Sequence, residues 1–161
     1  MLMKLKIETN FFCKSNHWSR RMKKIKKIVS KVLLINKCGF KNNTFYYLNL
    51  IFVDDRRIKK MNYTFRKKNM TTDVLTFVNT LHSGNLKNET YCDIFFSSET
   101  IKKDAKNNLI NFYDHLTHLI IHCFLHVNGY DHKINSDFLK MKNLEKKILN
   151  ILKIKDPYLY E

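Results

Sequence analysis

Residues 122–132 read HCFLHVNGYDH and hold three of the seven histidines of this 161-residue chain. His122 and His126 are four residues apart, so on an α-helix they differ by about 40° and share one face. Gly129 can adopt the left-handed conformation that ends a helix, which lets His132 turn back towards the same point. We therefore predict three imidazoles that converge from a helix, a turn and a loop.

Three converging imidazoles predict a metal site. Three neutral nitrogen ligands leave one coordination position open, as in catalytic rather than structural zinc sites. Zinc lowers the pKa of a bound water to about 7, so hydroxide becomes available at neutral pH. We expect one zinc ion per chain, although imidazole also suits nickel and copper. A lone histidine on a buried helix is more often a hydrogen-bonded core residue, and we interpret His115 and His118 in this way.

The same spacing fits the metzincin peptidase pattern H-E-x-x-H-x-x-G-x-x-H, in which the Glu after the first His is the general base. In this chain Cys123 occupies that position. A thiol packed in a helix is a poor replacement for a carboxylate that accepts a proton. The chain therefore keeps the three metal ligands of this pattern but lacks its general base, so a peptidase is the weaker interpretation.

Hydrophobic periodicity around this stretch predicts a series of interspersed strands and helices. We expect strands over residues 1–11, 44–53, 73–80 and 91–97, and helices over 16–36, 54–65, 98–108, 112–128 and 136–152, with a surface loop over 81–90. The order predicts a mixed α/β fold in a single domain over residues 1–161. In it, a mixed sheet of about four strands is flanked by helices, and the metal site lies at the end of a long central helix.

Two helices carry apolar residues at helical spacing, which is typical of a buried stripe. In the helix over 16–36 the stripe consists of Trp18, Met22, Ile25, Val29 and Val32. In the last helix it consists of Phe138, Met141, Leu144, Ile148 and Ile151 or Leu152.

The positive charge is concentrated in the N-terminal half. Up to Lys68 there are 19 Lys and Arg against 3 acids, whereas 11 basic and 11 acidic residues follow. Clustered basic residues release counterions from phosphates, so the asymmetry favours a polyanionic partner such as nucleic acid. The alternative is a solvated lysine face left by an AT-biased genome.

Cysteine usage and hydropathy indicate the compartment. Cys13, Cys38, Cys92 and Cys123 form no C-x-x-C pair, which argues against a cysteine zinc site and against a disulfide framework. The first twelve residues alternate and carry charges, unlike a signal peptide. No stretch approaches the roughly 18 apolar residues that span a bilayer. We expect a cytoplasmic protein that has no membrane partner.

The 122–132 segment resembles the signature of the YbeY family of bacterial endoribonucleases, H-G-x-L-H-L-x-G-Y-D-H. Residues 62–77 are similar to the family's L-N-x-x-[YF]-R followed by T-D-V-L-S-F, and residues 92–97 to its G-D-I-x-I-S. Met141, Glu145 and residues 156–158 are similar to the end of the family. The resemblance covers about residues 50–158, with Cys123 and Cys92 standing where the family has Gly.

This resemblance implies a metal-dependent endoribonuclease that cuts single-stranded RNA. In the family the activity serves 3′-end maturation of small-subunit ribosomal RNA and ribosome quality control, with the small ribosomal subunit as a partner. The three histidines carry over as zinc ligands and Arg66 as the active-site arginine, whose planar fork of donors suits a charged phosphorane. We expect the basic N-terminal half, including Arg56, Arg57, Lys67 and Lys68, to hold the RNA backbone.

The general base and the competing functions are left open by the residues. Asp131 and Asp73 are candidate bases, but Asp131 could instead orient a ligand imidazole and Asp73 could cap a turn. The alternatives are a metallopeptidase and a non-catalytic ribosome-assembly factor whose metal is structural. The sequence indicates no oligomeric state.

Overall fold

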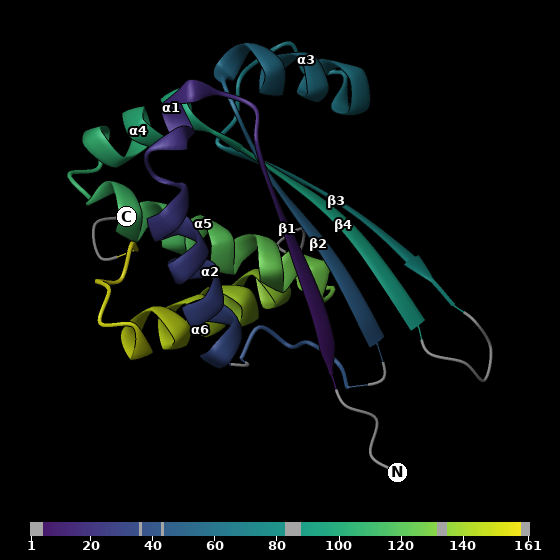
Figure 1. Ribbon diagram of the computed structural model, residues 1–161. Helices are drawn as coiled ribbons and strands as arrows, with labels where there is room; N and C mark the ends of the chain where they lie inside the picture. Colours follow the sequence, from purple (N-terminus) through teal and green to yellow (C-terminus); the bar gives the residue numbers. More distant parts are fainter. Residues whose placement is uncertain (1–4, 36, 43, 83–87, 132–134, 159–161) are drawn as a thin grey trace. The chain divides into compact units, whose positions relative to one another are not determined.

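The strands form one mixed sheet, shown in Figure 1. The computed structural model describes residues 5–35, 37–42, 44–82, 88–131 and 135–158. Its strands are β1 (Lys6–Cys13), β2 (Thr44–Val53), β3 (Val74–Leu81) and β4 (Asn88–Ser97). They lie in the order β1-β2-β4-β3; β1, β2 and β4 are parallel, whereas β3 is antiparallel to β4. The predicted mixed sheet of about four strands is confirmed.

Helices are interspersed with these strands, as the mixed α/β prediction requires. They are α1 (Asn16–Ser19), α2 (Met22–Ile35), α3 (Asp55–Arg66), α4 (Ser98–Asn107), α5 (Phe112–Val127) and α6 (Asn135–Ile151). The chain divides into two compact units, one of Met1–Met22 with Phe40–Lys103 and one of Lys23–Gly39 with Asp104–Glu161. That they form a single domain over residues 1–161 stays a prediction.

The predicted helix over residues 16–36 is interrupted, which corrects one expectation. α1 ends at Ser19 and α2 begins at Met22, next to the boundary between the two units. Trp18 of α1 is fully buried, and its indole Nε1 donates a 2.8 Å hydrogen bond to the carbonyl of Val53 at the end of β2. This bond fastens α1 to the sheet, so α1 belongs to the first unit while most of α2 belongs to the second.

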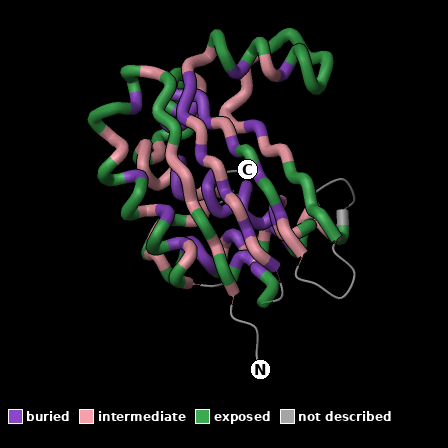
Figure 2. The backbone as a smooth tube through the Cα atoms, turned by 45° about the vertical axis from the view of Figure 1, so that its right-hand side comes forward, coloured by how far each residue is buried: buried purple, intermediate pink, exposed green. Residues whose placement is uncertain are grey.

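Within the first unit, buried residues alternate with less buried ones along much of the two inner strands, as the colours of the backbone in Figure 2 indicate. Leu48, Leu50 and Phe52 of β2 are fully buried, and so are Ile94 and Phe96 of β4. The Phe52 and Phe96 rings stack with centroids 5.2 Å apart. These residues are among the largest fully buried side chains of the protein, so their burial contributes substantially to hydrophobic stabilisation.

Helix α3 packs at one end of the sheet (Figure 1). The Asp54 side chain caps its N-terminus by accepting a 2.9 Å hydrogen bond from the backbone N–H of Arg57. Ile58 is fully buried in a cluster with Val53 and Leu75. The helix is thereby held by its apolar face, and its basic residues are left on the outside.

The second unit contains α2, α5 and α6. Ile25, Val29 and Val32 of α2 are buried as predicted, whereas Met22 is only half-buried. In α5 the buried residues are Leu116, Thr117, Leu119, Ile120, Ile121, Cys123, Phe124, Leu125 and Val127. None of the helices in the described parts of the chain combines the length and the apolar character needed to cross a membrane.

The buried stripe of α6 differs from the prediction. Met141, Glu145, Ile148 and Leu149 are buried, whereas Phe138 is 40% and Ile151 48% exposed. The spacing of four, three and one residues is that of a helix face, but the observed face includes an acid in place of Leu144. The predicted burial of Phe138 was wrong, and of the alternatives Ile151 and Leu152 the first is exposed and the second half-buried, because the buried face includes Glu145 and not Leu144.

We predict that Trp18→Phe lowers the free energy of unfolding by about 2 kcal/mol, because it removes the donor to the buried carbonyl of Val53 and leaves a smaller ring in the core. Urea denaturation measures the change. Tyr63→Phe is the control, since Tyr63 is 58% exposed and should change stability by less than about 0.5 kcal/mol. Equal stability of Trp18→Phe and the parent protein would contradict the prediction.

Candidate metal and nuclease site

His122 and His126 face one another on the last turns of α5. Their Nε2 atoms are 3.0 Å apart, and the ring centroids are 4.5 Å apart with the ring planes at 85°. The helix thus brings together the two histidines whose spacing predicted a shared face. His132, the third predicted ligand, lies outside the described residues.

The proton on His126 is placed by a backbone carbonyl. His126 Nδ1 lies 2.8 Å from the carbonyl oxygen of Tyr130. A carbonyl oxygen has no proton to give, so Nδ1 must be the donor. A neutral imidazole carries one N–H, and the Nε2 of His126 therefore presents a lone pair towards His122.

The proton on His122 is placed by a carboxylate. His122 Nδ1 lies 2.7 Å from Oε1 of Glu145, which is 1% exposed. Burial by itself raises the pKa of Glu145, but hydrogen bonds from His118, His122 and Tyr158 outweigh it and bring that pKa to about 2. Glu145 is then ionised at neutral pH and can only accept, so the Nε2 of His122 also presents a lone pair.

With both Nε2 atoms facing each other at 3.0 Å, a positive charge between the rings, either a proton or a metal ion, would stabilise this arrangement. Two zinc–nitrogen bonds of about 2.0–2.1 Å at a tetrahedral angle would place such nitrogens about 3.4 Å apart. The observed separation of 3.0 Å is shorter than this, but both nitrogens face the same point, as two ligands of one metal ion would. Within the described residues no group of three His, Cys, Asp or Glu side chains is placed to hold one.

A tight turn after α5 supplies the carbonyl that binds His126. Gly129 has a φ of +86°, and its N–H donates to the carbonyl of His126 at 3.0 Å. The N–H of Tyr130 donates to the carbonyl of Leu125 at 3.1 Å, which completes a Schellman motif. The sequence prediction that Gly129 ends the helix in the left-handed conformation is confirmed.

Gly39 makes room for the side chain of this turn. It has a φ of +83°, and a Cβ atom built on it would lie 2.9 Å from Cε2 of Tyr130. Such a distance is closer than real Cβ contacts, so any side chain at position 39 would push the Tyr130 ring away. A glycine far away in the sequence thus helps to seat the residue whose carbonyl orients His126.

The other residues that the sequence singled out near the histidines have different surroundings. His118 Nε2 is 3.1 Å from Oε2 of Glu145, so His118 is a hydrogen-bonded residue beside the pair. Cys123 is fully buried, whereas Asp131 is half-buried.

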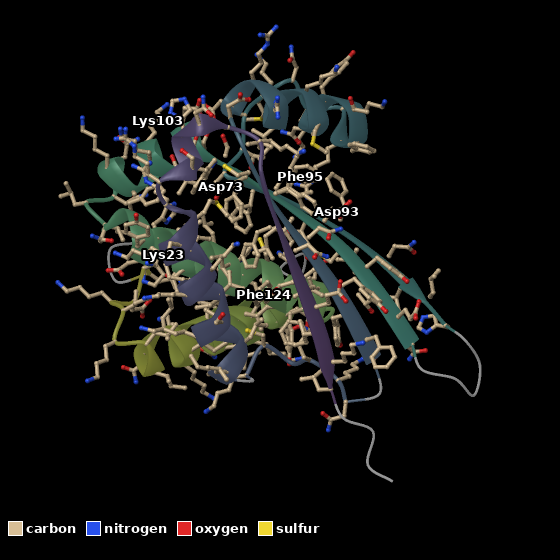
Figure 3. The ribbon with its side chains drawn as sticks, viewed as in Figure 1. Lys23, Asp73, Asp93, Phe95, Lys103 and Phe124 are labelled. Atoms are coloured by element: carbon tan, nitrogen blue, oxygen red, sulfur yellow. The ribbon has the colours of Figure 1, made fainter. Side chains whose placement is uncertain are left out.

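Asp73 belongs to the first unit, where it precedes β3; it is labelled in Figure 3. Its Oδ1 accepts a 2.7 Å hydrogen bond from the N–H of Val74 and a 3.0 Å bond from the hydroxyl of Thr72. Its backbone carbonyl accepts from the N–H of Ser97 at 2.8 Å. These bonds are those of a residue that caps the turn into the strand.

Arg66 is the last residue of α3 and is exposed. The chain after it is held by Lys67, which has a φ of +58°, and by Asn62, whose buried Nδ2 donates to the carbonyl of Met70 at 2.9 Å. Arg56, Arg57, Lys67 and Lys68 are exposed as well. Figure 3 shows side chains with nitrogen tips pointing outward from α3. Arg66 and the histidine pair belong to different units.

Comparisons with known proteins assign this arrangement to a family. Residues 11–153 match the family model described as Endoribonuclease YbeY. The chain belongs to the YbeY family. It is 41% identical over 112 residues to Endoribonuclease YbeY of Bartonella henselae, a match that covers 69% of this chain and 71% of that protein. It is 39% identical over 112 residues to Endoribonuclease YbeY of Agrobacterium fabrum, covering 69% and 67%.

A solved structure supports the fold of this YbeY family member. The solution structure of TM1509 from Thermotoga maritima matches with a TM-score of 0.50 and 22% sequence identity, covering 91% of this chain and 92% of that one. At this identity the likeness concerns the fold alone. It agrees with the mixed sheet and interspersed helices described above.

Sequence reasoning on this YbeY family member missed the role of Glu145 in the site. The family resemblance includes Glu145 but does not indicate that its side chain is buried. A signal was present, because Glu145 lies four residues after Met141 and three before Ile148, in the middle of an apolar face of α6. An acid at such a position has to find a partner when the face is buried. The carbonyl of Tyr130 gave no signal of this kind, since every residue has one.

We predict that Gly129→Ala lowers the free energy of unfolding by about 1–2 kcal/mol, because alanine is strained in the left-handed region. α4 ends in the same motif, with Leu109 at a φ of +53° and 95% exposed in place of the glycine. Leu109→Gly should therefore raise the free energy of unfolding by up to about 1 kcal/mol. Urea denaturation of both variants tests this, and a shift of the same sign in both would contradict it.

Proposed function

We propose that this protein is a metal-dependent endoribonuclease that cleaves single-stranded RNA in the cytoplasm. The proposed cleavage serves 3′-end maturation of small-subunit ribosomal RNA and ribosome quality control. The proposed partner is therefore the small ribosomal subunit. Membership of the YbeY family supports the nuclease activity. The single observation that carries the metal dependence is the pair of histidine Nε2 atoms that face each other 3.0 Å apart on α5.

The proposed ligands are His122, His126 and His132, with one zinc ion per chain. A divalent metal in such a site supplies a Lewis acid that activates water and polarises a phosphoryl oxygen. The protein contributes orientation: the carbonyl of Tyr130 holds the Nδ1 proton of His126, so that Nε2 of this ring keeps its lone pair for binding. Nickel or copper would also suit imidazole ligands.

Arg66 is proposed to bind the scissile phosphate. Its guanidinium group presents parallel donors that match two phosphate oxygens, and it keeps its charge at every physiological pH. Its exposed position at the end of α3 leaves it accessible to a ligand. We propose that Asp131 helps to orient a ligand imidazole and that Asp73 caps the turn before β3. We prefer these roles to that of general base.

The RNA backbone is proposed to bind along the basic exterior of the N-terminal half. Arg56 and Arg57 begin α3, and Lys67 and Lys68 follow its end, all of them exposed. The two acids at the start of this helix accept hydrogen bonds from other groups of the protein. Asp54 caps the helix, and Asp55 accepts hydrogen bonds from Ser97 and Thr100. The seven Lys and Arg between residues 56 and 68 outnumber these two acids, so the net charge of the segment is positive, which suits phosphates without selecting a base sequence.

A peptidase is the less favoured alternative. In the metzincin pattern the residue after the first histidine supplies the general base. Here that residue, Cys123, is fully buried and uncharged in its usual thiol form. A non-catalytic ribosome-assembly factor remains the second alternative, and the experiments below separate all three.

We predict that removing metal with a chelator abolishes cleavage of a fluorescent single-stranded RNA, and that zinc restores it. His126→Ala should reduce the rate by about 100-fold or more, because one ligand is lost. His17→Ala is the control, since the side chain of His17 is 65% exposed and lies in the first unit. Circular dichroism checks that both variants fold.

Other results would select another function. A zinc-loaded parent protein that binds RNA and does not cut it would contradict the nuclease and favour the assembly factor. Cleavage of a peptide substrate in place of RNA would favour the peptidase.

We predict that Arg66→Lys lowers RNA cleavage by about 10–100-fold although the charge is kept, because lysine lacks the planar fork of donors. Arg57→Lys on the same helix should change the rate by less than about twofold, since a general phosphate contact needs charge alone. Single-turnover cleavage rates of both variants give the comparison. Equal rates for Arg66→Lys and the parent would exclude a bidentate role for Arg66.

A further inference from the structure

Glu145 of α6 divides its two carboxylate oxygens between different partners. Oε1 lies 2.7 Å from Nδ1 of His122. Oε2 lies 3.1 Å from Nε2 of His118 and also accepts a hydrogen bond from the hydroxyl of Tyr158. A carboxylate that is 1% exposed is costly to bury unless its oxygens are satisfied, and here three donors surround it. The oxygen that faces His122 is separate from the one that the other two share.

The segment after α6 is fastened back onto that helix. Oδ2 of Asp156 is 2.9 Å from Nζ of Lys146, and Oδ1 of Asp156 accepts a 2.9 Å hydrogen bond from the N–H of Tyr158. Nζ of Lys142 lies 4.0 Å from the centre of the Tyr158 ring. These contacts place the Tyr158 hydroxyl on Oε2, which leaves Oε1 to His122.

We propose that Glu145 is the positioning residue of the candidate metal site: it holds the proton of His122 on Nδ1 and so aims the Nε2 lone pair towards His126. The inference rests on the proposed function, because the aimed lone pair matters only if the ring binds a metal. A carboxylate on the outer nitrogen of a ligand imidazole fixes the ring orientation and makes the ligand more basic.

A purely structural role for Glu145 would have different consequences. A buried carboxylate that only joins α5 to α6 would stabilise the fold, yet it would leave the tautomer of His122 and the affinity for zinc unaffected. In a positioning role, both quantities depend on the hydrogen bond at Oε1. The experiment therefore measures the tautomer and the affinity and uses stability only as a check of folding.

The tautomer is measured first, in the metal-free parent protein. Nitrogen-15 NMR of the histidine rings near pH 8, where imidazole is ordinarily neutral, distinguishes a proton on Nδ1 from one on Nε2. His122 should carry its proton on Nδ1, and a His122→Gln sample assigns the signal. A His122 with its proton on Nε2 and none on Nδ1 in the parent protein would overturn the proposal without any variant of Glu145.

Zinc affinity is then compared by competition with a coloured chelator. Glu145→Gln keeps the shape of the side chain and removes its charge, so it should weaken zinc binding by about 10–100-fold and give a mixture of His122 tautomers. Glu99→Gln makes the same change in the first unit, where Glu99 accepts from the N–H of Asp55, and should leave the affinity within about threefold.

Tyr158→Phe is the control inside the cluster. It removes the hydroxyl from Oε2 and keeps the ring beneath Lys142, so the bond between Oε1 and His122 stays. Its zinc affinity should stay within about threefold of the parent. A loss of zinc affinity as large as that of Glu145→Gln would show that both variants act by loosening the whole cluster. This result would overturn the proposal.

The outcomes separate this inference from the proposed function. A parent protein that binds no zinc contradicts the metal-dependent activity, while the tautomer of His122 still decides the role of Glu145. A parent protein that binds zinc and an unchanged affinity in folded Glu145→Gln would overturn the positioning role and leave the proposed nuclease intact.

Discussion

A neutral imidazole has one proton for two nitrogens, and this constraint organises the whole candidate site. An acceptor placed at Nδ1 leaves the lone pair on Nε2. Both histidines have such an acceptor at Nδ1. It is the Tyr130 carbonyl for His126 and the Glu145 carboxylate for His122. The consequence is that the two Nε2 atoms face each other across 3.0 Å, where a positive charge between the rings would stabilise the pair.

Each part of the second unit near the histidines serves that constraint. Helix α5 is apolar enough to be buried along most of its length, which holds the two histidines on a rigid element. α6 packs against it and brings Glu145, while the turn at Gly129 brings the carbonyl of Tyr130. In the first unit, a hydrogen bond to a backbone carbonyl again fixes the chain near a proposed site residue. The side chain of Asn62 donates to the carbonyl of Met70, which lies beyond Arg66 in the sequence.

The sequence predicts the features that depend on spacing and misses those that depend on partners. The shared face of His122 and His126, the left-handed Gly129 and the strand over residues 44–53 follow from local periodicity and backbone preference. Tertiary contacts decide the rest. Trp18 bonds to Val53 and separates α1 from α2, and a buried acid in α6 displaces the predicted stripe. Neither effect is visible when apolar residues alone are counted along one helix.

The two histidines differ in how their outer nitrogen can be altered. The acceptor for His122 is a side chain, so a single codon change at position 145 can retune that ring. The acceptor for His126 is part of the main chain, which no substitution at position 130 can delete. Only a change in the path of the backbone, for example through the glycines at 129 and 39, can move it. Substitutions, in relatives or by engineering, can therefore change the hydrogen-bond acceptor of His122 directly. They can change that of His126 only by moving the backbone.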